Sequence, residues 1–286
     1  MIYFITLLNG ISLASYLFIM ALGLNLSFGL LRIVNLSHGA FFMVGGFVGW
    51  SAFQFTGNWW LSMLAAGIVI GALALFQEFV LLRRARGNPV METLITLSVA
   101  VILADATLGI WGALPRRIPF PGFLSGQFWI GGMPLPRSSL FTFGFAVALG
   151  IIFWIVLRKT KAGMIIRAGV DNFEIVSTLG INVRILFTVM FAVAGFMAGV
   201  AGMIGGTFQM IAPGEDLRIM VFALVVMILG GMGSFEGSIV GALVIALAFS
   251  FGSLLAPHLG LFFIFAPVAL ILVFRPQGLL GKVVNI

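Results

Sequence analysis

The chain alternates between long apolar runs and short polar breaks, and this pattern predicts its main elements. Apolar segments long enough to cross a bilayer as helices cover residues 2–28, 37–54, 60–82, 91–113, 139–157, 185–210, 219–256 and 259–274. The segment 219–256 is long enough for two crossings and is broken near Gly230 to Gly237. Because lipid-exposed backbone must satisfy its own hydrogen bonds, we predict an all-α, polytopic membrane helix bundle with eight or nine transmembrane helices.

A polar segment at residues 158–184 stands between two long apolar runs. Its charged residues are Arg158, Lys159, Lys161, Arg167, Asp171, Glu174 and Arg184. Helical spacing gives it an apolar face made of Ile166, Val170, Phe173, Val176 and Leu179. A second, polar face comprises Arg167, Asp171, Glu174 and Thr178, and Gly180 is expected to end the helix. The segment is either a solvated helix that connects two spans or a docking helix for a cytosolic partner.

The composition supports a membrane protein and excludes several other classes. The chain is 62% hydrophobic and 8% charged, with a mean hydropathy of +1.23, whereas a soluble domain carries about 25% charged residues. The net charge of +7 does not indicate nucleic-acid binding, because the basic residues cluster beside the apolar segments. Cysteine is absent, which excludes disulfides and thiolate chemistry, and residues 1–31 lack the basic region of a cleavable signal peptide.

Lys and Arg residues are unevenly distributed between the two sides of the predicted bundle. If segment 158–184 is cytoplasmic, its side also holds Arg32, Arg83, Arg84, Arg86, Arg275 and Lys282. The other side holds Arg116, Arg117, Arg137 and Arg218, together with the loop 114–138, which is rich in Pro, Gly and aromatic residues. This bias predicts a cytoplasmic segment 158–184 and C-terminus. The N-terminus would lie outside with nine crossings and inside with eight.

Small residues recur at four-residue spacing in several apolar segments. The longest row is Ala194, Ala198, Gly202 and Gly206, and shorter rows pair Gly45 with Gly49, Gly67 with Gly71, and Gly237 with Gly241. Such rows let helices approach closely in lipid. They therefore predict a tightly packed bundle, and they carry no chemistry of their own.

Two polar breaks interrupt the apolar pattern and are candidates for a solute pathway. The first contains Asn35, Ser37, His38 and Gly39, and the second contains Gly231, Gly233 and Ser234. Broken or re-entrant helices at these places would expose backbone groups to a cavity, as in many transporters. The alternative is two tight cytoplasmic turns, capped by Asn35 or Ser37 and by Glu236. On the first interpretation, the pathway is mainly apolar and takes its polar groups from the two breaks.

Asp105 is an ionisable residue inside a predicted span, which makes it a functional candidate. It would serve either in proton coupling or in a hydrogen bond to a neighbouring helix, and the lack of a second clear acidic residue in the spans favours the structural role. Glu78 and Glu92 lie near Arg83 to Arg86, and we expect ion pairs there.

Signals for enzymatic chemistry are missing from the sequence. It has no phosphate-binding Gly-x-x-x-x-Gly-Lys-Ser/Thr loop, no His-Glu-x-x-His and no Gly-x-Ser-x-Gly motif. Two His and no Cys make a metal site an unfavourable interpretation. The chain is therefore predicted to be neither an enzyme nor a metalloprotein, and any ATP used would be bound by other subunits.

Several segments together resemble a known family, the permease subunits of branched-chain amino-acid ABC importers, and are closest to its shorter, LivH-type members. The segments are Gly23 to Gly46, Arg86 to Leu103, Ile165 to Val183, Ala194 to Gly206, Gly230 to Ala242 and Phe274 to Gly281. The resemblance implies a single transmembrane permease domain over 1–286 in a bacterial inner membrane. Relatives also carry urea, short amides and other small acids, so the resemblance is less specific for substrate.

The resemblance also implies partners and residue roles. Partners would be a second homologous permease, two cytosolic ABC ATPases and a periplasmic solute-binding protein. Arg167 to Ile181 would be the coupling helix that docks on an ATPase, although Ser177 and Thr178 stand where many relatives have Ala. Asn35 to Gly39 would be a turn near the pathway. Two other classes stay open: a proton-coupled secondary transporter using Asp105, and a membrane assembly protein without a pathway.

Overall fold

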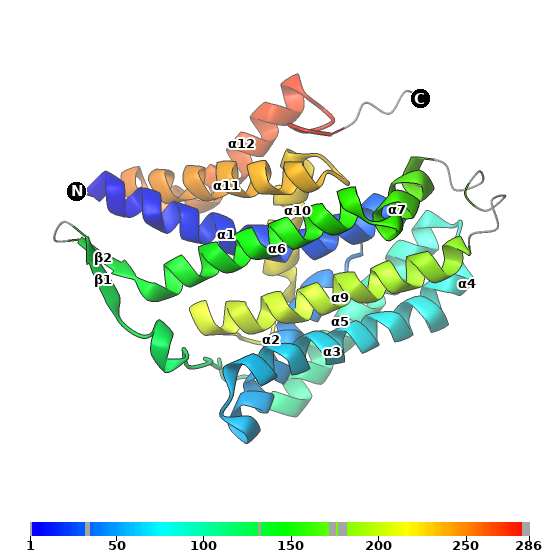
Figure 1. Ribbon diagram of the computed structural model, residues 1–286, viewed down its shortest axis with the longest axis horizontal. Coiled ribbons are helices and arrows are strands. Elements are labelled where there is room, and N and C mark those ends of the chain that lie inside the picture. Colours follow the sequence, from blue (N-terminus) through cyan, green and yellow to red (C-terminus); the bar gives the residue numbers. More distant parts are fainter. Residues whose placement is uncertain (1, 32–34, 131–132, 172–175, 177–181, 282–286) are drawn as a thin grey trace.

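The computed structural model describes residues 2–31, 35–130, 133–171, 176 and 182–281 as a helix bundle (Figure 1). Its first half contains α1 (Ile2–Leu31), α2 (His38–Thr56), α3 (Trp59–Phe76), the π-helical segment η1 (Gln77–Leu82), α4 (Arg83–Ala85), α5 (Pro89–Trp111) and η2 (Gly122–Leu124). The second half contains β1 (Gln127–Ile130), β2 (Met133–Pro136), α6 (Arg137–Lys159), α7 (Lys161–Asp171), α9 (Val183–Phe208), α10 (Asp216–Gly230), α11 (Phe235–Leu255), η3 (Pro257–Leu259) and α12 (Gly260–Phe274).

Seven helical segments of the described chain are long and apolar enough to cross a membrane. They are Ile2–Phe28, Trp59–Ala85, Pro89–Trp111, Arg137–Lys159, Ile185–Phe208, Phe235–Leu255 and Pro257–Phe274. The predicted count of eight or nine is therefore not confirmed. The predicted and observed numbers of spans differ because α2 and α10 are not among these seven segments.

The helix α10 explains much of this difference. It has 15 residues, which span about 22 Å at 1.5 Å per residue, less than the hydrocarbon core of about 30 Å. Figure 1 shows α10 at a steep angle to α1, α6 and α9, so that it crosses the inside of the bundle. The apolar run 219–256 thus contributes one crossing, α11, and one internal helix.

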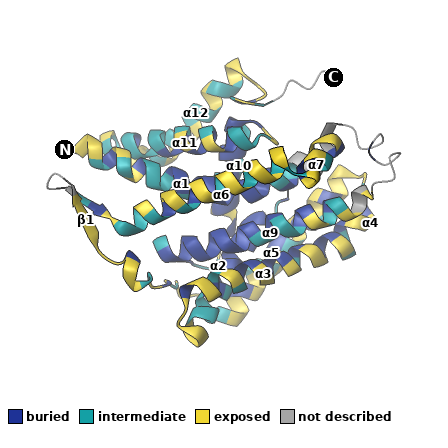
Figure 2. Cartoon of the chain, viewed as in Figure 1, coloured by how far each residue is buried: buried dark blue, intermediate teal, exposed yellow. Residues whose placement is uncertain are grey.

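The core is built around α2 and α9, which pack against each other through glycines. Figure 2 shows buried residues concentrated on these two helices and exposed residues on outer helices such as α6 and α12. A Cβ atom on Gly202 would lie 2.0 Å from the carbonyl oxygen of Phe42, and one on Gly45 would lie 2.5 Å from the Cα atom of Gly199. The rows of small residues therefore mark real places of backbone contact, as predicted.

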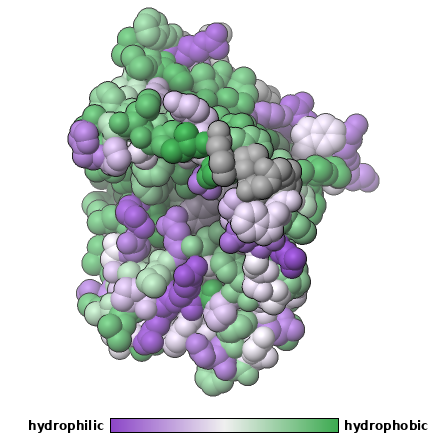
Figure 3. Space-filling view, turned by 90° about the vertical axis from the view of Figure 1, so that its left-hand side faces the viewer, coloured by the Kyte–Doolittle hydropathy of each residue, from purple (hydrophilic) through white to green (hydrophobic). Residues whose placement is uncertain are grey.

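The end of the bundle that carries β1 and β2 is closed by an ordered loop, and we call it the hairpin end. The strands pair antiparallel, with Gln127 opposite Pro136, a feature that the composition of this loop did not reveal. The backbone of Arg116 exchanges two hydrogen bonds of 2.8 Å with Ile211. Figure 3 looks onto this end and shows hydrophilic residues scattered among hydrophobic ones. The opposite end carries α4 and α7 (Figure 1), and we call it the α7 end.

Candidate functional site

The first polar break forms a buried turn that leads into α2. The Asn35 side-chain oxygen accepts hydrogen bonds from the backbone N–H of Ser37 at 3.1 Å and from its hydroxyl at 2.5 Å. The same hydroxyl lies 3.0 Å from the side-chain oxygen of Gln77, while the Gln77 side-chain nitrogen has no partner among the described residues. A hydroxyl carries one hydrogen, so the Gln77 amide is better placed with its nitrogen donating to Ser37. This bond ties the turn to η1.

His38 and Gly39 begin α2 deep inside the bundle. The His38 Nε2 atom lies 3.0 Å from the carbonyl oxygen of Met20 in α1, and its Nδ1 atom has no partner in the described chain. A Cβ atom on Gly39 would lie 2.1 Å from the carbonyl oxygen of Asp216. The N-terminal ends of α2 and α10 therefore meet here, and both carry the positive end of a helix dipole.

The second break is a turn between α10 and α11 that α1 holds in place. The Asn25 side-chain nitrogen donates to the Ser234 carbonyl at 2.7 Å and lies 2.6 Å from the Ser238 hydroxyl, and its oxygen accepts from the Gly233 N–H at 2.5 Å. Gly231 and Gly233 have φ of +109° and +78°, which favour glycine. The Ser234 side chain caps α11 by accepting from the Gly237 N–H at 3.0 Å.

The structure thus gathers the predicted pathway residues into two groups. Asn35, Ser37, His38 and Gly39 form the first group, and Gly231, Gly233 and Ser234 form the second. Both groups contact α1, at Met20 and at Asn25. Sequence reasoning missed Asn25, which is one of two amide side chains, with Asn9, in an uncharged apolar segment.

A buried ion pair lies where η1 meets the loop before α5. The Arg86 guanidinium pairs with Glu78, which is 1% exposed, and lies 4.9 Å from the ring centre of Phe187. Glu92 is also buried and accepts a hydrogen bond from the Gly87 N–H at 3.1 Å. The predicted ion pair is therefore confirmed for Glu78, whereas the hydrogen bond of Glu92 comes from the backbone.

The expected docking helix is present in part as α7, at the α7 end. Ile166 and Val176 are buried in one cluster with Phe187 and Met190 of α9, so this part of the apolar face packs on the chain itself. Arg167 and Met164 are exposed. Asp171 is the last residue of α7, and Phe173, Glu174 and Gly180 lie outside the described residues.

Other candidate features carry less chemistry. Asp105 is exposed on α5, and its side chain has no hydrogen-bond partner in the described chain. Glu236 lies in the first turn of α11, as expected, and its side chain also pairs with Arg158 at 2.8 Å. Among the described residues, no three His, Asp or Glu side chains are grouped as a metal site would need.

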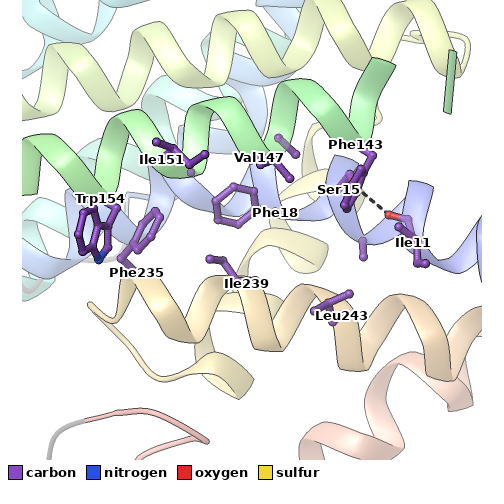
Figure 4. Close-up of a pocket in the computed structure, with 13 residues that line it drawn as sticks. Ile11, Ser15, Phe18, Phe143, Val147, Ile151, Trp154, Phe235, Ile239 and Leu243 are labelled. Atoms are coloured by element: carbon purple, nitrogen blue, oxygen red, sulfur yellow. Dashed lines mark hydrogen bonds between the residues drawn. The ribbon is translucent and has the colours of Figure 1, made fainter. Parts of the chain in front are cut away.

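An apolar groove of about 340 Å³ lies between α1, α6 and α11. Figure 4 shows Trp154 beside Phe235 at one end of the groove, Phe18 in its middle and Phe143 beside Ser15 at the other end. The one hydrogen bond drawn is internal to α1, from Ser15 to Ile11 at 2.8 Å. A charged solute would lose its hydration there without gaining a partner. The groove is therefore unsuited to a charged solute.

Comparisons with known proteins agree with the family resemblance. The family model described as "Branched-chain amino acid transport system / permease component" matches residues 6–273. The high-affinity branched-chain amino-acid transport system permease protein BraD of Pseudomonas aeruginosa is 26% identical, over 98% of this chain and 96% of its own. The corresponding protein LivH of Escherichia coli K12 shows the same values. The fructose import permease protein FruF of Bifidobacterium longum is 30% identical, over 75% of this chain and 61% of its own.

No solved structure matches the chain. The family match covers nearly the whole sequence and includes both polar breaks, α7 and the glycine rows. The chain therefore belongs to the family of branched-chain amino-acid transport system permease components.

Proposed function

We propose that this chain is the permease subunit of an ATP-driven importer for branched-chain or other aliphatic amino acids. The family match over residues 6–273 is the observation that carries this proposal, together with the two high-affinity relatives. Its partners would be a second permease, two cytosolic ATPases and a periplasmic solute-binding protein, in a bacterial inner membrane. ATP would be bound and hydrolysed by the partner ATPases.

The α7 end is proposed to face the cytoplasm. It carries Arg83, Arg84, Arg86, Arg158, Lys159, Lys161 and Arg167, whereas the hairpin end carries Arg116, Arg117 and Arg137. Loops rich in Lys and Arg stay on the cytoplasmic side. In this orientation, α7 is available to cytosolic ATPases and the hairpin end to a periplasmic protein.

A packed route leads from α7 to the start of α2. Ile166 of α7 packs in one cluster with Phe187 and Met190 of α9. Farther along α9, Gly199 contacts Gly45 of α2, and α2 begins at the turn that contains His38. Close-packed helices move as units because their interfaces do not deform continuously. Movement of α7 by an ATPase would therefore be transmitted to the first polar break.

Met164 tests whether the outer face of α7 is the ATPase contact. Met164→Glu is expected to weaken ATPase association about 30-fold, because a buried apolar anchor is worth about 2 kcal/mol. Phe173→Ala is expected to act in the same way if it is the anchor that the sequence predicted. Co-purification of the ATPase, normalised to folded permease, measures the effect.

Ile166→Ala is the matched control for this experiment. Its side chain packs on α9, so it is expected to lower the yield of folded permease and to leave the ATPase affinity of the surviving fraction unchanged. Unchanged ATPase binding by both Met164→Glu and Phe173→Ala would contradict the docking role.

A substitution at Asp105 tests whether the chain works in an ATP-driven importer or as a proton-coupled transporter. Asp105→Asn is expected to keep leucine uptake within about twofold of the parent, because ATP and not a proton gradient drives the cycle. Uptake is measured in proteoliposomes that contain the whole importer, with and without ATP and with and without a proton gradient. Loss of uptake in a folded, assembled variant, or uptake driven by the gradient alone, would favour the secondary transporter.

A further inference from the structure

An ion pair at the start of α10 lies halfway along the bundle. Arg218 pairs with Glu215, and their side chains are 55% and 29% exposed. On sequence grounds Arg218 was placed outside the membrane with Arg116, Arg117 and Arg137. In the structure, the chain turns inward after Ile211, through Pro213 and a Gly214 with φ of +89°, and Arg218 lies in the first turn of α10.

One electrostatic interaction and two contacts indicate the depth of this ion pair. The Tyr16 side chain lies within electrostatic reach of both Arg218 and Glu215. The next residue, Asp216, contacts Gly39, whose neighbour His38 bonds to Met20. Tyr16 is near the midpoint of the span Ile2–Phe28, about 21 Å from Ile2 at 1.5 Å per residue. The pair is therefore level with the middle of α1.

Exposed charges at this depth need an environment other than lipid. An Arg or Glu at the centre of a bilayer is costly, and such residues face the bundle interior or a water-filled cavity and mark solute pathways. The exposed side chains near the start of α10 also include two apolar ones, Leu217 at 65% and Val221 at 39%. Val221 lies four positions after Leu217 and three after Arg218, so it is next to both of them on the helix surface.

We propose that this first turn of α10 is a station on the solute pathway that takes the zwitterionic head of an aliphatic amino acid. The Arg218 guanidinium would hold the carboxylate, and the Glu215 carboxylate would hold the ammonium group. Leu217 and Val221 would lie beside the aliphatic side chain. This inference rests on the proposed function and assigns residues that would contact its solute.

The chemistry of this pair favours an exchange of ion-pair partners over tight binding of the solute. Without solute the two charges neutralise each other, and with solute each pairs with one end of the zwitterion, so no charge is left unpaired at either stage. Arg presents a planar fork that matches a carboxylate. By contrast, the groove in Figure 4 has no charged side chain to offer.

The first test asks whether Arg218 faces water. The chain has no cysteine, so Arg218→Cys can be labelled in the assembled importer with a positively charged methanethiosulfonate reagent. Labelling is expected, at least in one nucleotide state. Ile152→Cys is the matched control, because Ile152 is exposed near the middle of α6 without charged neighbours, and it is expected to stay unlabelled in lipid. Arg117→Cys, at the hairpin end, is expected to label readily.

The second test measures uptake of radiolabelled leucine by the whole importer in proteoliposomes. Arg218→Gln is expected to lower uptake at least tenfold while ATPase assembly and folded yield stay at parental levels. Arg218→Lys keeps the charge without the fork and is expected to retain more uptake than Arg218→Gln. Arg117→Gln is expected to stay within about twofold of the parent.

The outcomes separate this inference from the proposed function. Protection of the Arg218→Cys variant from the reagent in every nucleotide state, or parental uptake by Arg218→Gln, overturns the station on α10 and leaves the importer intact. If the parent moves no aliphatic amino acid, the proposed function fails and with it the zwitterion as ligand. Labelling of the Arg218→Cys variant together with loss of leucine uptake in Arg218→Gln supports the inference.

Discussion

Arg86→Ala is expected to destabilise the folded chain by about 3–5 kcal/mol, because it leaves the buried Glu78 carboxylate without its partner. Glu78 is 1% exposed and Arg86 is 24% exposed, so water cannot replace the guanidinium fully. The substitution also removes the contact between Arg86 and the Phe187 ring. The free energy of unfolding, measured by SDS titration in mixed micelles, gives the size of the effect.

Two variants serve as controls for Arg86. Arg84→Ala removes an exposed arginine on the short helix α4, which ends just before Arg86, and is expected to change the free energy of unfolding by less than about 0.5 kcal/mol. The double variant Arg86→Met with Glu78→Leu removes both charges and is expected to recover most of the loss. If Arg86→Ala is no more destabilising than Arg84→Ala, the ion pair does not stabilise the fold.

Gly202→Ala is expected to cost about 3 kcal/mol, at the upper end of the range for overpacked cores. The new methyl group would lie 2.0 Å from the Phe42 carbonyl oxygen, and this obstacle is backbone that cannot rotate away. The helices α2 and α9 must therefore separate. We expect most of the protein to be lost to aggregation or degradation, as measured by the monodisperse fraction after detergent extraction.

Gly144→Ala is the matched control for Gly202. Gly144 also lies inside a helix, but a Cβ atom there would meet nothing within 4 Å. Its yield is expected to equal or exceed that of the parent, because Ala is the better helix former. Equal yields for the two variants would show that α2 and α9 can separate at little cost.

The long lipid-crossing helices were predictable from hydropathy. Predicted segments 91–113 and 139–157 correspond to α5, Pro89–Trp111, and α6, Arg137–Lys159. Their ends follow local chemistry, as where the Asn88 side chain accepts from the Met91 N–H and begins α5. Lipid requires an unbroken apolar run, and so hydropathy along the sequence is enough to locate these helices.

The internal helix α10 was not predictable in the same way. Hydropathy measures transfer from water into an apolar medium and does not distinguish lipid from the inside of a protein. α10 is apolar because it packs against α1, α2 and α11. The available signals are Pro213, Gly214 and the charge of Arg218 directly before the apolar run 219–256. The prediction uses only Arg218, as a charge on the external side.

The candidate site was predicted in its residues and not in its connections. Asn35, Ser37 and His38 do lie together, but their contacts include Gln77 and the backbone of Met20. Every residue has a backbone carbonyl, so the sequence does not show that the one of Met20 is the partner of His38. Gln77 is 40 positions from Ser37, so the sequence does not show that the two meet. Likewise, the apolar face of segment 158–184 gave no sign that Ile166 and Val176 pack on α9.

The bonds of Asn25 set an order of events during biosynthesis. Its partners, Gly233, Ser234 and Ser238, follow it by 208, 209 and 213 positions. At about 5–20 residues per second, α1 leaves the ribosome roughly 10–40 s before these partners are made. During this interval the Asn25 amide has no native partner, and lipid offers none. We therefore expect α1 to wait beside water or an insertion factor until α11 arrives.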